Sequence, residues 1–371
     1  MILFLHNRYR TTGGEERAVD DLLWLVREHL GEEALLLTRE SAAIGRARAA
    51  AGLLGGGLAP EQVAAAVRRS RARIVHAHNL NPSLGWRALA AARAAGARTV
   101  LHLHNYRLVC AVGTCFTRGA DCTRCHGRHT LPGVRLNCRG TGAEAAVYGA
   151  ALALWQRRLV AHADAVVVPS AFALERLRAL GAPLAGAAVH VVGHVVRAIA
   201  PRSAADAGTH ALVASRLAPE KGVDVAIAAC AAAGLPLVVA GDGPDRAALQ
   251  ARAAGTRTTF AGRVATGELD GLRATAGLAI VPSRAAETFG LAAAEAMAAG
   301  LPVVASAIGA LPELCDSAAL VAPGDAAALA LAARARFGDA RAGEAGRRRV
   351  LARAAPEAVA PALRAVYDSL A

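Results

Sequence analysis

SRAAETFGLAAAEAMAAGLPVV, residues 283–304, is the stretch that decides the fold of this chain. Within it, the Ala-rich run Phe289–Ala299 predicts a helix, which ends at Gly300 because glycine readily adopts the backbone of a helix C-terminus. The apolar run before Pro282 is typical of a buried strand, and so is the run that begins at Val303. The stretch therefore predicts a strand, a helix and a second strand in succession.

Two carboxylates flank the start of this helix. Glu287 lies in the loop before it and Glu295 inside it. Such glutamates are usually solvated, but the Ala, Leu and Met neighbours of Glu295 favour a buried or ligand-facing role. A helix N-terminus presents unbonded N–H groups and a partial positive charge, so Gly290 and Leu291 are predicted to bind a diphosphate. A ribose at Glu295 and a sugar at Glu287 would complete a nucleotide sugar as the ligand.

Strand and helix patterns alternate along the rest of the chain, which favours parallel sheets with helices on both faces. The strands predicted in the first half are Ile2–Leu5, Ala34–Thr38, Ile74–His76, Thr99–His104 and Ala165–Val168. Those predicted in the second half are Ala211–Ala214, Leu237–Ala240, Thr258–Ala261, Leu278–Val281 and Val303–Ala305. Between them, Val196–Gly208 lacks periodicity and is predicted to be a linker. We therefore expect an α/β fold of two doubly wound, Rossmann-like domains, residues 1–197 and 198–355.

Chain length indicates how many domains to expect, and net charge indicates which classes of molecule the protein can bind. The 371 residues exceed what one hydrophobic core normally serves, and 54% of them are hydrophobic, which is ample for two domains. The formal net charge is +13, yet arginines are spread through the predicted helices and only 4% of residues are aromatic, so nucleic acid is not expected as a partner. A basic surface suits an anionic sugar nucleotide or peripheral association with anionic lipid; a solvated face without a partner is the commonest alternative.

Apolar segments bear on location. No apolar run of about 18 residues is free of Gly, Pro or charge, as a membrane-spanning helix requires. The chain opens with the predicted strand MILFLH rather than with a charged leader and a cleavage site. These two features predict a cytoplasmic protein.

A pair of cations follows the first strand of the second half. Arg216 and Lys221 lie at a strand end, where they can stabilise a departing diphosphate without a metal ion. Each charge-assisted hydrogen bond of this kind contributes about 1.5–3 kcal/mol. The alternative is a surface pair beside Glu220. Gly241 and Gly243, after the next strand, are predicted to let a nucleotide lie close to the backbone.

Two glycines follow the first strand of the chain. Gly13 and Gly14 precede a helix predicted to begin near Glu16. Without side chains, they let the backbone approach a phosphate or an acceptor. An ordinary glycine turn is the alternative.

Histidines end two strands of the first half. His104 closes an apolar strand, so it is predicted to project toward bound substrates at the strand end. His102 lies two residues earlier on the same face and is interpreted as a core histidine. His78 and Asn79, which close the segment RIVHAHN, are weaker candidates for contact with an acceptor.

The stretch around Glu287 and Glu295 resembles the E-x7-E signature of the retaining glycosyltransferases of family four, which have the GT-B fold. Further motifs similar to that family occur in its order: GGEER (13–17), LHLHNYR (101–107), SRLAPEKGVD (215–224) and AGDGP (240–244). Each glycine-rich piece alone is a weak signal, but together they are specific. The resemblance covers nearly all 371 residues.

The resemblance implies two domains facing across a cleft, the first binding the acceptor and the second the donor. It also implies that a final helix within residues 356–371 crosses back to the first domain. The catalytic residues implied are His104, Arg216, Lys221 and Glu287. The implied donor contacts are Gly13, Gly14, Gly241, Gly243, Arg263, Val264, Phe289, Gly290, Leu291 and Glu295, with Arg263 and Val264 at the base. The implied acceptor contacts are His78 and Asn79.

The reaction implied is transfer of a hexosyl group from a nucleotide diphosphate sugar to a hydroxyl, with the anomeric configuration retained. A UDP sugar is favoured and a GDP sugar is the alternative donor. No carboxylate is placed as a nucleophile, so the leaving phosphate would take the acceptor proton, and no catalytic metal is expected. The acceptor can be a small metabolite, a lipid-linked sugar or a glycan. The alternative functions are a GT-B sugar-nucleotide epimerase and a nucleotide-sugar-binding subunit without activity.

Five of the seven cysteines fall between residues 110 and 138. The set predicted to bind zinc is Cys110, Cys122, Cys125 and Cys138, with His126 and His129 as substitutes. The C-x2-C pair in this set is typical of tetrahedral zinc sites, and the ion would be structural rather than catalytic. Disulfides are disfavoured in a cytoplasmic enzyme, which leaves reduced packing cysteines as the alternative. A similar cysteine-rich insertion occurs in a subgroup of the family that the chain resembles.

Overall fold

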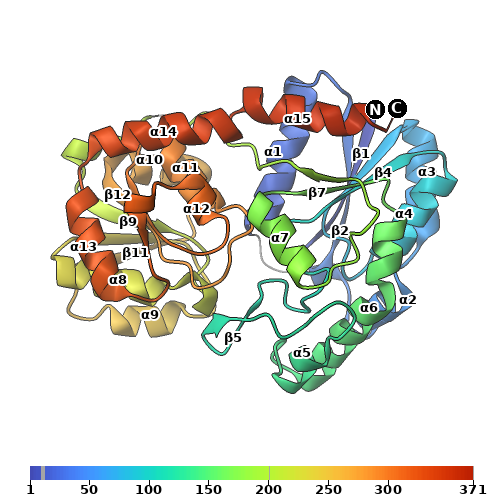
Figure 1. The fold of residues 1–371 in the computed structure, drawn as a ribbon, viewed down its shortest axis with the longest axis horizontal. Coiled ribbons are helices and arrows are strands. Elements are labelled where there is room, and N and C mark those ends of the chain that lie inside the picture. The colour runs from blue at the N-terminus through green and yellow to red at the C-terminus, as the bar shows by residue number, and fades with distance from the viewer. Residues whose placement is uncertain (10–12, 200, 371) are drawn as a thin grey trace. The chain divides into compact units, whose positions relative to one another are not determined.

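The computed structural model describes residues 1–9, 13–199 and 201–370. These residues form two compact units (Figure 1). The first unit comprises Met1–Thr117, Cys122–Val195 and Val359–Ala371, and the second comprises Arg118–Asp121 and Val196–Ala358. Each unit contains a six-stranded sheet with helices around it, so each is an α/β domain of its own.

The sheet of the first unit has the strand order β2-β1-β3-β4-β7-β8, with the strands paired in parallel. The strands are β1 (Ile2–Arg8), β2 (Ala34–Glu40), β3 (Ile74–Ala77), β4 (Arg98–His102), β7 (Ala165–Val168) and β8 (Val189–Val191). The helices before residue 195 are α1 (Gly14–Glu28), α2 (Arg46–Gly55), α3 (Pro60–Ser70), α4 (Gly85–Ala94), α5 (Leu131–Arg135), α6 (Gly142–Ala161) and α7 (Ala171–Ala179). A separate small sheet pairs β5 (Phe116–Thr117) with β6 (Ala120–Asp121). Because β1 lies between β2 and β3, the strand order reverses between β1 and β3.

The last helix, α15 (Pro356–Asp368), completes the core of the first unit. Its apolar residues recur at helical spacing, and Val359, Leu363 and Tyr367 are at most 2% exposed. They pack in one core with Ile2 and Phe4 of β1, which are fully buried. The first unit therefore joins the first strand of the chain to its last helix.

The sheet of the second unit has the order β11-β10-β9-β12-β13-β14, which is the Rossmann arrangement. Its strands are β9 (His210–Ala214), β10 (Leu237–Ala240), β11 (Thr258–Gly262), β12 (Ala276–Val281), β13 (Val303–Ser306) and β14 (Leu320–Val321). Its helices are α8 (Val223–Ala233), α9 (Arg246–Arg252), α10 (Thr266–Thr275), α11 (Leu291–Ala298), α12 (Leu311–Leu314), α13 (Ala326–Arg336) and α14 (Ala340–Ala354).

Alternate residues along these strands enter two separate cores. Ala211 and Val213 of β9 pack with apolar residues of α8 and α13, whereas Leu212 packs with those of α11 and α14. Successive side chains of a strand point to opposite faces, so a strand that is apolar throughout buries both. The second unit therefore carries helices on both faces of its sheet (Figure 1).

The predicted fold class, two Rossmann-like α/β domains, is confirmed. Three details differ from the expectation. The segment Val196–Gly208 is packed rather than free, because Val196 and Ile199 are 3% and 8% exposed in a core of the second unit. Strand β4 ends at His102, so His104 lies in the loop beyond it rather than at the strand end. The edge strands β8 and β14 were not predicted.

Candidate functional site

The strand order of the second unit reverses between β9 and β12, which are neighbours in its sheet. Connections that leave neighbouring strands in opposite directions open a crevice at the carboxyl ends, where doubly wound folds bind ligands. The loop after β9 carries Lys221, and the loop after β12 carries Ser283 and Glu287. The structure therefore brings together residues that are up to 66 positions apart in the sequence.

Lys221 and Glu287 are in direct contact at this reversal. Lys221 Nζ lies 2.7 Å from Glu287 Oε1, and the hydroxyl of Ser283 donates to the same oxygen at 2.6 Å. Burial raises the pKa of Glu287, but the ammonium and the hydroxyl outweigh burial and hold this pKa below its usual value. The carboxylate is thus ionised at neutral pH and can accept hydroxyl hydrogen bonds. Ser283 is the first residue of the stretch 283–304 but was not predicted as a site residue.

Lys221 is the only lysine among the 42 lysine and arginine residues of the chain. An ammonium is a compact point charge, whereas a guanidinium is a planar fork that needs more room. The single lysine of the chain thus lies where a compact cation meets a carboxylate. This signal was present in the composition and would have singled out Lys221.

Close packing of loops explains the glycines of this region. A Cβ on Gly222 would lie 2.1 Å from the carbonyl oxygen of Pro282, and one on Gly241 would lie 1.8 Å from that of Ser215. Gly243 likewise has a backbone carbonyl oxygen 2.3 Å from where its Cβ would be. Gly241 and Gly243 are therefore required by contacts within the unit, which is a reason independent of a bound nucleotide.

Helix α11 begins after Gly290, whose φ of 91° is rarely adopted by residues with a side chain. The first N–H groups of a helix have no acceptor within it, so the backbone from Leu291 onward can bind an anion. Phe289 is 6% exposed and its ring packs in a core of the second unit. A donor contact at Phe289 would therefore use its backbone.

Glu295 lies inside α11 and forms an ion pair with Arg273 of α10. Arg273 is 1% exposed and also donates to Asp270 Oδ1 at 2.8 Å. A guanidinium this deeply buried needs a counter-charge, so Glu295 has a structural role whatever it binds. Glu295 itself is 7% exposed, and the Arg273 contact fixes the orientation of its carboxylate.

The remaining cations predicted in the second unit are more exposed. Arg216 is paired with Glu220, and 45% of its side chain is accessible. Arg263 is exposed after β11, and Val264 packs partly against a core. Lys221 therefore pairs with Glu287 of a different loop, whereas Arg216 pairs with Glu220 of its own loop.

In the first unit, the predicted histidines meet after β3 and β4. His78 Nδ1 lies 2.7 Å from His104 Nε2, and the two residues are 3% and 9% exposed. Burial lowers the pKa of His104 to about 3, so its ring is neutral at pH 7. A neutral ring can orient a hydroxyl through a hydrogen bond but does not supply positive charge. Asn79 is turned inward, because its amide donates to the backbone oxygens of Asn7 and Asn81.

A carboxylate occupies the N-terminus of α1. Glu16 Oε2 accepts the N–H of Gly13 at 2.8 Å, and Glu16 Oε1 accepts that of Tyr9 at 3.0 Å. Glu15 lies beside it, and two carboxylates at one helix start disfavour a third anion. This arrangement argues against a diphosphate at Gly13 and Gly14.

A polar cluster missed by the sequence analysis surrounds Glu15. The Tyr9 hydroxyl donates to Glu15 Oε2 at 2.8 Å, and Asn105 Nδ2 donates to the same oxygen at 3.0 Å. Arg107 Nη1 donates to the Tyr9 hydroxyl at 2.7 Å, and burial raises the pKa of Glu15. Asn105 and Arg107 lie in the LHLHNYR motif, which pointed to the region but not to Glu15. The cluster offers several donors and acceptors to a polyhydroxyl ligand.

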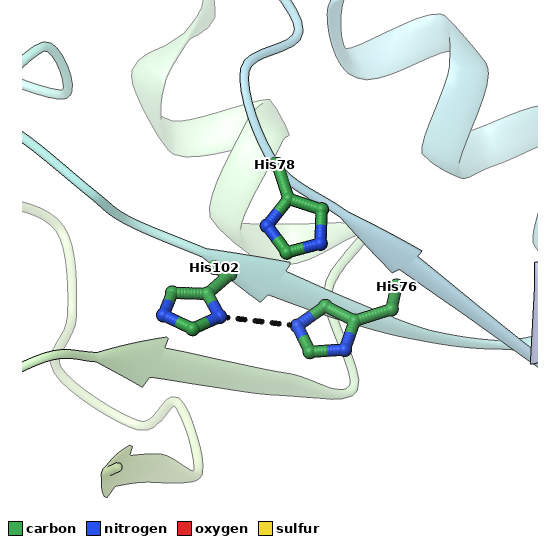
Figure 2. A group of neighbouring side chains, drawn as sticks. All are labelled: His76, His78 and His102. Carbon is green, nitrogen blue, oxygen red and sulfur yellow. Dashed lines mark hydrogen bonds between the residues drawn. The ribbon is translucent and has the colours of Figure 1, made fainter. Parts of the chain in front are cut away.

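Buried histidines form a stack in the core of the first unit. Figure 2 shows a hydrogen bond between His76 and His102, with His78 beside them. This bond joins His102 Nδ1 to His76 Nε2 at 3.3 Å. Neighbouring rings are nearly parallel: 15° for His76 and His78, and 10° for His102 and His104. Although ring nitrogens of His76, His78 and His102 lie within 4.8 Å of one another, parallel rings direct their lone pairs side by side rather than at one ion. We therefore interpret the stack as hydrogen-bonded core, which for His102 matches the sequence interpretation.

Comparisons with known proteins relate both halves of the chain to glycosyltransferases. Residues 27–193 match the family described as Glycosyl transferase 4-like domain, and residues 208–339 match the family described as Glycosyl transferases group 1. The chain has both domains of the GT-B glycosyltransferases. No helix in the described part of this GT-B chain is long and apolar enough to span a membrane.

Two solved structures resemble the whole GT-B chain. Sucrose-phosphate synthase from Thermosynechococcus elongatus aligns over 100% of this chain and 98% of its own, with a TM-score of 0.73 and 20% identity. Anabaena HepE in complex with UDP-glucose aligns over 99% of both chains, with a TM-score of 0.64 and 19% identity. At these identities the likeness shows the fold.

A curated relative is similar over a shorter segment. The GDP-mannose-dependent alpha-(1-6)-phosphatidylinositol dimannoside mannosyltransferase of Mycobacterium tuberculosis is 44% identical to the chain over 105 residues. That match covers 27% of this chain and 27% of the relative. The matched segment thus spans about a quarter of the relative's length.

Proposed function

We propose that the protein is a retaining glycosyltransferase that moves a sugar from a nucleotide diphosphate sugar to an acceptor hydroxyl. The observation that carries the proposal is the contact of Lys221 and Ser283 with Glu287 at the strand-order reversal of the second unit. It supplies a cation and an ionised carboxylate in the loops that lead into α8 and α11. A diphosphate and a sugar hydroxyl require these groups.

In the proposed reaction, the bond from the anomeric carbon to the diphosphate breaks and the acceptor oxygen bonds to the same face of that carbon. Lys221 and the first N–H groups of α11 stabilise the charge that develops on the diphosphate. Arg216 supplies a second cation. The leaving phosphate oxygen takes the acceptor proton, so no carboxylate nucleophile is needed. Glu287 accepts hydrogen bonds from sugar hydroxyls and thereby positions the anomeric carbon.

GDP-mannose is the donor that we propose to test first. The relative named as GDP-mannose-dependent is 44% identical over 105 residues, whereas HepE, solved with UDP-glucose, is 19% identical. The motif resemblance alone favoured a UDP sugar, so UDP sugars are the second choice. Glu295 would bind the ribose, which both nucleotides contain.

The acceptor is proposed to bind the first unit, where neutral His104 and the cluster around Glu15 can orient a hydroxyl. A lipid-linked sugar is favoured over a small metabolite or a glycan for two reasons. The printed acceptor of the curated relative is a phosphatidylinositol dimannoside, and a formal net charge of +13 suits an anionic lipid surface. The subgroup with a cysteine-rich insertion is the part of the family to which we assign the chain.

Replacing Glu295 with Gln is expected to weaken GDP binding by about 10- to 150-fold, because the loss of a charged hydrogen-bond acceptor costs about 1.5–3 kcal/mol. Gln is preferred to Ala, because its amide oxygen can still accept a hydrogen bond from the buried Arg273 guanidinium, which Asp270 continues to neutralise. Isothermal titration calorimetry with GDP and with UDP measures the effect. Glu268→Gln is the matched control, because Glu268 is an exposed glutamate of α10, and it is expected to bind GDP like the parent protein.

GDP affinity equal to that of the parent would remove Glu295 from the donor site. A second measurement does not depend on any variant. Because Lys221 is the only lysine, labelling with ¹⁵N-lysine gives one lysine amide signal, which is expected to shift when GDP is added. Incubation of the parent with GDP-mannose separates the alternative functions: an epimerase would convert the sugar without an acceptor, and a binding subunit would leave the donor intact.

A further inference from the structure

Five cysteines surround one small cavity in the first unit. Cys110, Cys115, Cys122, Cys125 and Cys138 line it together with apolar residues that include Phe116 and Leu136. Its volume is about 20 Å³, which is room for about one water-sized particle. Five sulfur atoms around a space of this size are the donor set of a single soft metal ion.

The segment that carries these cysteines has little structure of its own. Between β4 and α6, the described chain contains only the two-residue strands β5 and β6 and the five-residue helix α5. Long connections with so little regular structure are uncommon in compact domains. They cannot bury a core large enough to hold their own shape, and small folds of this kind are commonly held together by a metal or disulfides.

Backbone hydrogen bonds place the cysteines around the cavity. The N–H of Cys122 donates to the carbonyl oxygen of Cys115 at 2.7 Å, and the N–H of Cys138 donates to that of Gly133 at 3.0 Å. Gly133 faces the cavity, and a Cβ there would lie 3.6 Å from Cys125 Sγ. Three stretches of the segment are thus joined at the cavity wall, although its cysteines span 28 positions of sequence.

Two of these thiols lie at long distances from nearby oxygen atoms. Cys125 Sγ lies 3.9 Å from the carbonyl oxygen of Thr130, and Cys138 Sγ lies 3.6 Å from the hydroxyl of Thr117. None of the five cysteines forms a disulfide in the described structure. Cys115 donates a hydrogen bond to the sulfur of Cys110. Such a bond can orient Cys110 as a metal ligand, so Cys115 does not need to bind the ion itself.

We propose that Cys110, Cys122, Cys125 and Cys138 bind one zinc ion in this cavity, which holds the segment between β4 and α6 in its folded shape. Four thiolates and Zn²⁺ carry a net charge of −2, so nearby cations are needed. Arg107 and Arg139 provide them, because they donate to the carbonyl oxygens of Val112 and Ala111, which line the cavity.

Histidine is not needed as a fourth ligand. Of the substitutes considered from the sequence, His126 and His129 are absent from the cavity wall within the described residues, and their backbones bond to each other. Iron also binds four thiolates tetrahedrally, so the identity of the metal is part of the test. Zinc binding here is independent of sugar transfer, so the two proposals can fail separately.

The test begins with the metal content of the full chain, purified under reducing conditions without chelators or affinity metals. Elemental analysis is expected to find about one zinc per chain. X-ray absorption is expected to show four sulfur ligands at about 2.3 Å. The Cys122→Ser and Cys125→Ser variants are expected to lose the zinc and to unfold several degrees lower than the parent.

Matched controls separate this site from the other thiols of the chain. Cys230→Ala and Cys315→Ala change buried cysteines of the second unit and are expected to retain the zinc. Cys115→Ala is expected to retain it as well, because Cys115 is assigned a supporting hydrogen bond. If the ligand variants fail to fold, a mercurial reagent added to the parent should displace zinc, which a metal-sensitive dye then detects.

Three results would overturn the proposal. The first is less than a tenth of an equivalent of zinc in the reduced parent, with its thiols either free or paired in disulfides. The second is zinc bound through nitrogen ligands, which would place the metal at the histidines. The third is iron rather than zinc in the S4 site. Loss of zinc from the Cys115→Ala variant with retention in a Cys138→Ala variant would overturn the ligand set.

Discussion

The Lys221→Met variant is expected to turn over about 100 to 1,000 times more slowly than the parent, the range seen when one preorganised donor to a developing negative charge is removed. The ammonium matters more as the diphosphate departs than while the donor is bound. The loss should therefore fall on kcat, with a smaller change in GDP affinity. Initial rates of GDP release at saturating acceptor, together with calorimetry, separate the two quantities.

Two variants test whether the contact with Glu287 matters rather than charge alone. Lys221→Arg keeps the charge but replaces a compact ammonium by a planar fork, and it is expected to restore little of the lost rate. In a double-mutant cycle, Lys221→Met and Glu287→Gln should be strongly non-additive, since their side chains lie 2.7 Å apart. Parental turnover by Lys221→Met would place the reaction elsewhere in the protein.

The first unit is expected to unfold in mild acid, with a midpoint of about pH 5. Burial lowers the pKa of His76 and His104 to about 3, and it holds the pKa values of His78, His102 and His194 well below their usual range. In the unfolded chain these rings titrate near about pH 6.5. The unfolded state therefore binds more protons below that pH, and stability is lost as the pH falls from about 6.5 toward 3.

The magnitude follows from the number of rings. Each buried neutral histidine costs about 1.4 kcal/mol of stability per pH unit below about 6.5, and domains are typically stable by about 5–15 kcal/mol. Five such rings can therefore reduce the free energy of unfolding of the first unit to zero within about two pH units below 6.5. Trp24, Trp86 and Trp155 are the only tryptophans of the chain and all lie in the first unit, so fluorescence follows this unit selectively.

Two histidine variants calibrate the acid transition. His102→Phe removes one ring from the stack and is expected to make the dependence of stability on pH shallower. His129→Gln changes an exposed histidine and should leave the transition unchanged. Native fluorescence that persists to pH 4 in the parent would contradict the predicted mechanism, because the loss of stability expected from five buried neutral rings would not have occurred.

The strands and α11 could be predicted because their local signals agree with the final fold. Buried parallel strands carry unbroken apolar runs, and the Ala-rich helix ends at Gly300. Strands β8 and β14 contain three and two residues at sheet edges, which is too little pattern to recognise. Local sequence thus predicted the main strands and helices, and which of them belong to each of the two domains.

The partners of the site residues could not be predicted in the same way. Lys221 and Glu287 were singled out separately, but their contact depends on β9 and β12 being neighbours, which is a property of sheet order. The ion pair of Glu295 with Arg273 joins two helices whose packing no periodicity specifies. One contact did have a local signal, since Gly13 and Glu16 have the i, i+3 spacing of a capping box.

The position of α15 in the first core determines the order in which the units can mature on a ribosome. Residues 1–195 are synthesised first, yet the core around Ile2 and Phe4 is not complete until residues 359–367 have emerged. At about 5–20 residues per second, that delay is on the order of ten seconds. The second unit is nearly continuous in sequence and can mature during this interval. The half that is made first is therefore completed last, and its nascent sheet is the part of the chain most in need of chaperone protection.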